Sequence, residues 1–156
     1  MPVITKGEAM KLEGEVTILA PREKVWDFLL DIEGMSECVP GLESMETVEP
    51  DHVYRAIVSV GLGTVRVKFD ADVEWLELER PTRALLKGHG TAPGSAGDAT
   101  AEMVLSDGHD GSTILTWWAD VIVSGTIASL ASRLMGGVTK KLTSTFFDCV
   151  RKQVEQ

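Results

Sequence analysis

The amino-acid sequence predicts a protein of the α+β class, in which a curved antiparallel sheet of about seven strands wraps around a long C-terminal helix. Three observations predict this class. Residues 126–154 contain no proline, and their apolar residues recur at intervals of three and four, as on one face of a helix. The chain before them consists of short apolar stretches separated by turn residues. A helix of this length needs a large concave partner to cover its apolar face, and these stretches are the only candidate.

A first strand and a helix are predicted near the N-terminus. Residues 11–19 favour a strand, and Pro21 then opens a helix, because proline is well tolerated in a first helical turn. We expect Gly34 to end this helix and a short turn-like stretch to lead to residues 38–41. The predicted buried side of the helix consists of Val25, Trp26, Leu29 and Leu30.

Six further strands are predicted in the middle of the chain. The clearest lies at residues 65–75, where apolar and charged side chains alternate with a period of two. Turn residues separate the strands, and short connections between successive strands imply hairpins and therefore an antiparallel sheet. The other five strands are predicted at residues 42–48, 53–60, 83–90, 96–105 and 113–123.

The long C-terminal helix is predicted to have an apolar face and a basic face. It carries five basic residues and one acidic residue, a net charge of +4, so that −13 remains for the rest of a chain whose net charge is −9. Arg133, Lys140 and Arg151 fall on one face, away from the apolar residues. One interpretation is that these cations complement the helix dipole and keep the face solvated. The other is a docking face for an anionic membrane or an acidic partner. The apolar face consists of Ile127, Ala131, Leu134, Met135, Val138, Leu142, Phe146 and Cys149.

Composition and charge exclude several classes of protein. The net charge of −9 argues against nucleic acid as a partner, because phosphate neutralisation needs clustered Lys and Arg. No apolar run approaches the ~20 residues that span a bilayer. Residues 1–9 are too short and too polar for a secretory signal. We therefore expect a cytoplasmic protein without a transmembrane anchor.

Metal-binding and catalytic motifs are not evident. Cys38 and Cys149 form no CxxC motif and are expected to be reduced thiols, with Cys38 a small core or turn residue. The three histidines lack neighbours at metal-ligand spacing, so no metal site is predicted. The glycine-rich stretches at residues 61–63 and 92–97 lead into strands, whereas phosphate sites need a helix N-terminus. Strand parity points Asp120 outward, so no catalytic residue is predicted.

The predicted inner face of the sheet lacks bulk. In the strand at residues 83–90, the parity that points Leu86 inward also points Gly88 and Gly90 inward, and the next strand adds Ala99 and Ala101. Because protein interiors are close-packed, bulky neighbours must fill this volume or a ligand must occupy it. The candidates for filling it are Phe69, Trp75, Trp117 and Met135. The second interpretation is an apolar pocket for a lipophilic small molecule, with a wall formed by Phe69, Leu86, Met103, Trp117, Leu130, Leu134, Met135 and Val138.

An outward apolar row suggests a contact surface. Ile114, Trp118 and Ile122 share the outer face of their strand, and such a row is unusual on the surface of a monomer. The alternatives are that a loop or the N-terminal segment covers the row, or that the register is shifted by one residue. Together with Arg133 and Lys140, the row forms the predicted partner-facing or membrane-facing surface.

The order of elements and several segments resemble a known family. A strand, a Pro-started helix, a short helix, a six-strand meander and a long terminal helix resemble the helix-grip fold of the START/Bet v 1-like (SRPBCC) superfamily. Within it, the segments APREKVWDFLLD, CVPG, VGLGTVRVKFDADVEW and SRLMGGVTKKLTSTFF are similar to the carbon monoxide dehydrogenase G-subunit family. The resemblance covers about residues 10–147. It implies two short helices after the first strand, a single domain at residues 10–156, and an N-terminal extension at residues 1–9.

The resemblance also implies a function. The family is associated with membrane recruitment of molybdenum-containing carbon monoxide dehydrogenase-type oxidoreductases and with a hydrophobic cavity for a quinone. We therefore expect a non-catalytic accessory protein that binds a quinone-like or lipid-like molecule and no other cofactor. Some members add a hydrophobic C-terminal anchor, which this sequence lacks, so only transient contact with the inner membrane is expected. The alternatives are a small cyclase-like or dehydratase-like enzyme and a pure docking adaptor. The sequence predicts neither the ligand's identity nor the oligomeric state.

Overall fold

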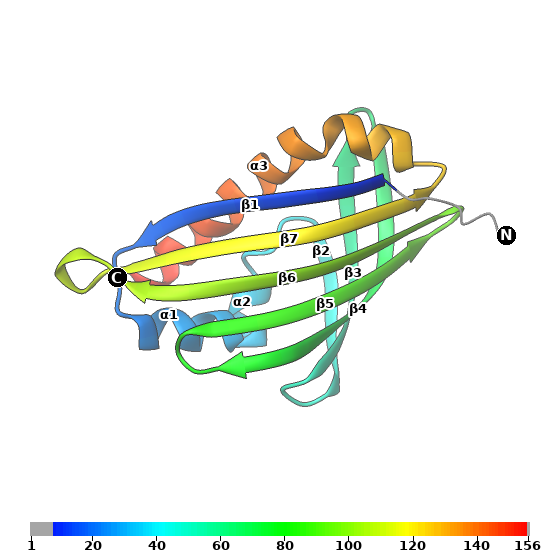
Figure 1. The fold of residues 1–156 in the computed structure, drawn as a ribbon. Helices are drawn as coiled ribbons and strands as arrows, with labels where there is room; N and C mark the ends of the chain where they lie inside the picture. Colours follow the sequence, from blue (N-terminus) through cyan, green and yellow to red (C-terminus); the bar gives the residue numbers. More distant parts are fainter. Residues whose placement is uncertain (1–7, 156) are drawn as a thin grey trace, which may run out of the picture.

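Seven antiparallel strands form one curved sheet, and a long helix packs along its concave side (Figure 1). The computed structural model describes residues 8–155, and the sheet has the strand order β1-β7-β6-β5-β4-β3-β2. The strands are β1 (Glu8–Ile18), β2 (Leu42–Glu49), β3 (Val53–Leu62), β4 (Val65–Glu79), β5 (Arg83–Ala92), β6 (Ser95–Asp107) and β7 (Thr113–Gly125). The helices are α1 (Arg22–Leu30), α2 (Ile32–Ser36), the short 3-10 helix η1 (His109–Gly111) and α3 (Ala128–Val154). The predicted fold class is confirmed.

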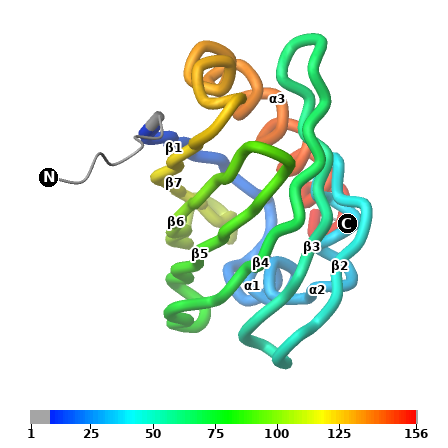
Figure 2. The backbone as a smooth tube through the Cα atoms, turned by 90° about the vertical axis from the view of Figure 1, so that its right-hand side faces the viewer, coloured from blue at the N-terminus to red at the C-terminus, as the bar shows by residue number. Residues whose placement is uncertain are grey.

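Successive hairpins build the sheet from β2 to β7, and β1 then pairs with β7. Each predicted strand is present and is extended by a few residues at one or both ends, except that β1 ends at Ile18, one residue before its predicted end. Gly63 and Gly94 lie in the β3–β4 and β5–β6 turns with φ of +66° and +71°, a conformation that glycine adopts without steric cost. The tube view in Figure 2 shows how the sheet curves from β1 to β2, so that its inner side can surround a helix. β1 already begins at Glu8, and the rest of the predicted N-terminal extension lies outside the described residues.

The first helix ends earlier than predicted. Pro21 takes the N-cap position of α1 with extended backbone, and Val25, Trp26 and Leu29 are buried, as expected. The break comes at Asp31, whose backbone is extended, whereas Gly34 lies inside α2. A Cβ at Gly34 would lie 2.9 Å from a carboxylate oxygen of Asp31. The prediction that Gly34 ends the helix is therefore wrong, because the glycine instead leaves room for the Asp31 side chain beside α2.

The helix α3 divides the core into two clusters. Near its N-terminal end, Ala131 packs with Leu62, Val67 and Val123. Near its C-terminal end, Val150 and Val154 pack with residues of α1 and of the sheet, among them Trp26. The predicted apolar face of the helix is confirmed, since its residues belong to these clusters or face the space between them.

The two cysteines form a disulfide bond. Cys38, just after α2, is bonded to Cys149 of α3, with their Cα atoms 5.4 Å apart. The expectation of reduced thiols is therefore wrong for this structure. The two residues are 111 positions apart, and only the packing of α3 against the segment after α2 brings them together. Cysteine spacing along the sequence carries no sign of such a pairing.

Candidate functional site: apolar cavities between sheet and helix

Two apolar cavities lie side by side between the sheet and α3. The N-terminal cavity, beside the first half of the helix, has a volume of about 300 Å³. The C-terminal cavity, beside its last turns, has a volume of about 210 Å³. Their walls adjoin on the sheet, because Leu86 and Ala101 line the second cavity, and Gly88 and Ala99, two residues further along the same strands, line the first.

The N-terminal cavity exists because small residues face the helix. Gly90 lies on the inner face between Ala71 and Gly97 of the neighbouring strands, so three adjacent positions provide almost no side-chain volume. A Cβ at Gly90 would lie 3.5 Å from Ala71 and Phe69, which is an ordinary contact distance. The other residues that line this cavity are Gly88 and His89 of β5, Asp98 and Ala99 of β6, and the apolar residues Val60, Leu62, Phe69, Val121, Val123, Ile127, Ala131, Met135, Val138 and Leu142. The lack of bulk predicted for the inner face therefore leaves open volume.

The C-terminal cavity has a largely aromatic wall. Trp75 and Trp117 come from the sheet, and Phe146 and Phe147 come from α3. The two phenylalanine rings meet edge to face with centroids 5.0 Å apart. Leu29 of α1 and Met35 of α2 also line the cavity, together with Leu86, Ala101, Glu102, Met103, Leu115 and Trp118 of the sheet.

The chemistry of both cavities is that of a hydrocarbon surface. Among the described residues, every buried side-chain nitrogen and oxygen has a hydrogen-bond partner. None of these buried polar side chains is therefore left unpaired for a ligand to bind. A ligand in these cavities would be held by apolar contact rather than by directed hydrogen bonds.

Six of the eight predicted wall residues line a cavity. Phe69, Met135 and Val138 line the N-terminal cavity, whereas Leu86, Met103 and Trp117 line the C-terminal cavity. The other two, Leu130 and Leu134, line neither and pack into the core cluster around Leu62 and Ala131. Leu134 reaches the β3–β4 turn, where a Cβ on Gly63 would lie 3.3 Å from its Cδ1.

Sequence reasoning missed the wall residues that come from the short helices and from the last turns of α3. Helical spacing assigns Leu29 only to a buried helical side, and neither Met35 nor Phe147 belongs to a predicted face. The neighbouring Phe146 lies on the predicted apolar face, and two adjacent phenylalanines are the one signal that could have extended the wall to Phe147.

The predicted outward row does lie on the outer face of the sheet. Ile122 is 48% exposed, whereas Ile114 and Trp118 are partly buried. The indole N–H of Trp118 donates a hydrogen bond of 2.9 Å to Glu102, and the Lys11 ammonium lies 5.7 Å from the ring centroid. Glu102 of β6 and Lys11 of β1 thus fix the side chain of Trp118, the central residue of this row.

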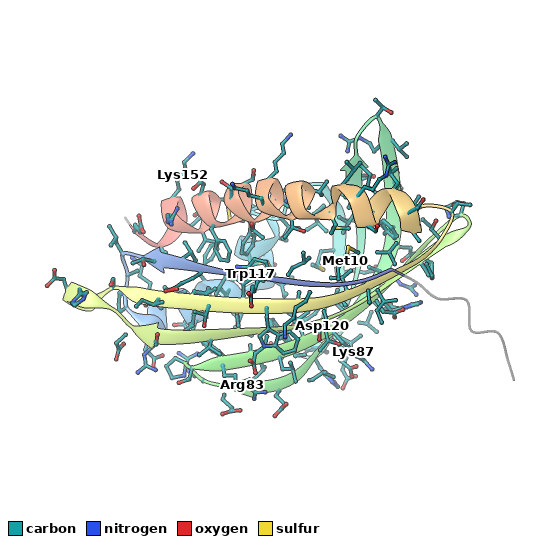
Figure 3. The ribbon with its side chains drawn as sticks, turned by 45° about the horizontal axis from the view of Figure 1, so that its top comes forward. Met10, Arg83, Lys87, Trp117, Asp120 and Lys152 are labelled. Atoms are coloured by element: carbon teal, nitrogen blue, oxygen red, sulfur yellow. A yellow bond between two sulfur atoms is a disulfide. The ribbon has the colours of Figure 1, made fainter. Side chains whose placement is uncertain are left out.

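Arg83 completes this outer network. Its guanidinium binds Glu102 as well as Glu77 and Glu79 of β4, and these carboxylates, Glu77 first, raise the pKa of Arg83. The hydrogen bond from Trp118, followed by that from Arg83, lowers the pKa of Glu102. Arg83 and Lys87 project from the outer face of the sheet, and Lys152 lies on the side of α3 that faces away from the sheet (Figure 3).

Acid–base side chains near the cavities are exposed rather than enclosed. His89 and Asp98 are among the residues that line the N-terminal cavity, whereas Asp120 lines neither cavity. Asp120 is exposed on the outer face of β7. His89 is exposed as well, and its Nδ1 lies 2.6 Å from a carboxylate oxygen of Asp98. Within residues 8–155, no group of three His, Cys, Asp or Glu side chains is placed to hold a metal ion.

Comparison with known protein families accounts for this architecture. The family model of the carbon monoxide dehydrogenase G-subunit (CoxG) matches residues 14–155, nearly the whole chain. The chain belongs to the CoxG family. Among curated proteins, none matches this CoxG-family chain. No helix in the described part of the protein is long and apolar enough to cross a membrane.

Several solved structures share the fold. A conserved protein from Geobacillus kaustophilus is 28% identical to the CoxG-family chain, with a TM-score of 0.86 and coverage of 94% of this chain and 95% of that one. The ZhuI aromatase/cyclase from a Streptomyces species is 18% identical, with a TM-score of 0.73 and coverage of 95% and 94%. Ara h 8.0201 is 16% identical, with a TM-score of 0.67 and coverage of 94% and 98%. The helix-grip, Bet v 1-like fold is confirmed.

Proposed function

We propose that this CoxG-family protein is a non-catalytic accessory protein that carries a lipophilic small molecule, quinone-like or lipid-like, between its sheet and α3. The observation that carries the proposal is the pair of adjoining cavities with apolar walls. Burial of one methylene group stabilises a complex by about 0.8 kcal/mol, so a long hydrocarbon chain gains most from such a site. The partner would be a carbon monoxide dehydrogenase-type oxidoreductase, which the protein would assist in membrane recruitment or in electron transfer to quinone.

The charge of α3 supports contact with an anionic membrane surface. Arg133, Lys140, Lys141 and Lys152 are exposed on α3, whereas the rest of the chain is strongly acidic. Each Lys or Arg near an anionic bilayer contributes about 1 kcal/mol to binding. This contact is transient, because it rests on a few surface cations that salt screens.

The cyclase-like alternative is the weaker one. General acid–base chemistry on a bound guest needs a titratable side chain within hydrogen-bond reach of it. Asp120 is exposed on the outer face of the sheet. His89 lines the N-terminal cavity, but its side chain is exposed and lies against Asp98.

Ligand binding can be tested with one cavity-filling substitution and one matched control. Ala99 faces the N-terminal cavity, and the adjacent Thr100 faces the opposite side of β6. We expect decylubiquinone or oleate to bind the wild type in native mass spectrometry and in a titration followed by tryptophan fluorescence. Ala99→Leu should weaken the binding of both probes by about tenfold, because the added methyl groups occupy ligand volume. Thr100→Leu should bind like the wild type.

Two outcomes would count against this function. Absence of binding by the wild type for both probes, with no small molecule released from the purified protein by organic solvent, would refute it. Equal affinities of Ala99→Leu and Thr100→Leu would show that the ligand does not occupy the N-terminal cavity. A difference between decylubiquinone and oleate would identify the ligand as quinone-like or lipid-like.

A further inference from the structure

A groove of about 630 Å³ runs between the edge strand β1 and α3. In the described structure β1 pairs with β7 alone, so its other edge faces the helix. Thr139, Thr143 and Ser144 line the helix side of the groove. At one end the groove is closed by two contacts. The Arg151 side chain donates a hydrogen bond of 3.3 Å to the Thr17 carbonyl, and the Leu19 N–H donates one of 2.7 Å to Glu155.

Two aromatic side chains separate this groove from the C-terminal cavity. Trp117 and Phe147 line both spaces. Trp117 lies on β7 next to β1, on the side of the sheet that faces α3 (Figure 3). Phe147 comes from α3 on the other side of the groove. A solute that moved from the groove into the cavity would therefore pass these two rings.

Gly14 gives the Trp117 ring its position. The two residues are direct partners in the β1–β7 pairing. A Cβ at Gly14 would lie 2.7 Å from the indole Nε1 and 2.9 Å from Cε2 and Cζ2, so the ring lies directly on the glycine backbone. Any other residue at position 14 would push the ring out of this place.

The part of α3 that lines the groove contains two glycines, which make the helix less stable there. Gly136 lines the groove, and Gly137 follows it in the middle of α3. A Cβ at either position would meet no described atom within 4 Å outside the adjacent helix backbone. Two helical glycines without packing partners lower the local stability of α3, because glycine is less favourable than alanine in a helix interior.

From these four observations we infer that the groove between β1 and α3 is the mouth of the C-terminal cavity, and that Trp117 and Phe147 form its gate. The inference rests on the proposed function and specifies the path of the ligand. The groove is lined by hydroxyl groups and by charged side chains of both signs, among them Lys140 and Asp148, and the cavity has apolar walls. An amphiphile therefore fits best, with its hydrocarbon tail inside and its polar head in the groove. Opening requires the indole ring to swing away from Gly14.

The experiment compares two adjacent positions on α3 by stopped-flow fluorescence, with the apolar dye N-phenylnaphthylamine as the probe. Ser144 lines the groove but neither cavity, whereas Thr145 is exposed and lines none of these three spaces. We expect Ser144→Trp to slow both association and dissociation of the dye by about fivefold with little change in affinity, because it obstructs the path and not the site. Thr145→Trp should keep the wild-type rates.

A second variant tests the gate itself. Trp117→Ala removes one of the two rings and should accelerate dissociation of the dye by about fivefold or more. If Trp117→Ala does not fold, as judged by circular dichroism, the comparison of Ser144→Trp with Thr145→Trp still tests whether the groove is the mouth of the cavity. A folded Ser144→Trp variant with wild-type rates would overturn the inferred mouth while leaving the binding site in place. Failure of the wild type to bind the dye at all would overturn the C-terminal cavity as a site for apolar ligands, and with it the inferred mouth.

Discussion

The indole N–H of Trp118 and the guanidinium of Arg83 both bind the carboxylate of Glu102 on the outer face of the sheet. Both contacts favour the charged form and lower the pKa of Glu102 from its ordinary value of 4.5. A carboxyl group whose pKa is depressed on folding contributes stability above its unfolded pKa and loses that contribution as the pH falls through its folded pKa. The network should therefore weaken under acidic conditions.

The pH dependence of stability can be predicted from this one residue. We expect Glu102→Gln to flatten the decrease in the free energy of unfolding as the pH falls below about 4.5, relative to the wild type, because glutamine does not titrate. Urea denaturation at several pH values measures this slope. Glu46→Gln, at an exposed position on β2, is the control and should follow the wild type. Identical slopes for Glu102→Gln and the wild type would contradict the network's role.

At the scale of elements, α3 is less stable than its length suggests. Gly136→Ala and Gly137→Ala should each raise the free energy of unfolding by about 0.5–1 kcal/mol, because alanine restricts the unfolded chain and its methyl group meets no obstacle. Chemical denaturation measures the gain. Ser132→Ala, at an exposed position on the same helix, is the control. It measures how the free energy of unfolding changes when alanine replaces a residue other than glycine. A loss of stability in both glycine variants would show that the pair has a packing role.

Periodicity is sufficient to predict most elements and the direction of many side chains. Alternation along the strands predicts that Leu86 and Met103 face α3 and that Ile122 faces outward, as the structure shows. Helical spacing places Arg151 on a solvated face, yet its side chain turns toward β1 and binds the Thr17 carbonyl. That hydrogen bond joins residues 134 positions apart, and local patterns contain no information about such contacts.

At the scale of the whole molecule, the disulfide bond joins the first and last parts of the domain. The Cys38–Cys149 bond closes a loop of 111 residues, and in the chain-entropy description a cross-link of this span stabilises the folded state by about 4–5 kcal/mol. We expect Cys38→Ala/Cys149→Ala to lose a large part of that free energy in urea denaturation. Dithiothreitol should destabilise the wild type to a similar extent and leave the double variant unchanged. Equal stability of the wild type with and without reductant would contradict this role.

The candidate site could be predicted in outline because its origin is local. Glycine and alanine side chains are too small to fill the space between a sheet face and the helix that covers it. These small residues can be recognised in the sequence. The aromatic wall and the disulfide could not be predicted, since each depends on how closely the last turns of α3 approach α1 and α2. The ligand itself stays a prediction.

The separation of charge between α3 and the sheet has a consequence for how the molecule turns in an electric field. Exposed cations lie along α3 on one side, and β4 carries Asp70, Asp72, Glu74, Glu77 and Glu79 on the other. The protein is therefore an electric dipole whose positive pole is the helix. Within a Debye length of about 10 Å at 0.1 M salt, a negatively charged surface exerts a torque on this dipole. That torque rotates the molecule until α3, and with it the groove beside β1, faces the surface first.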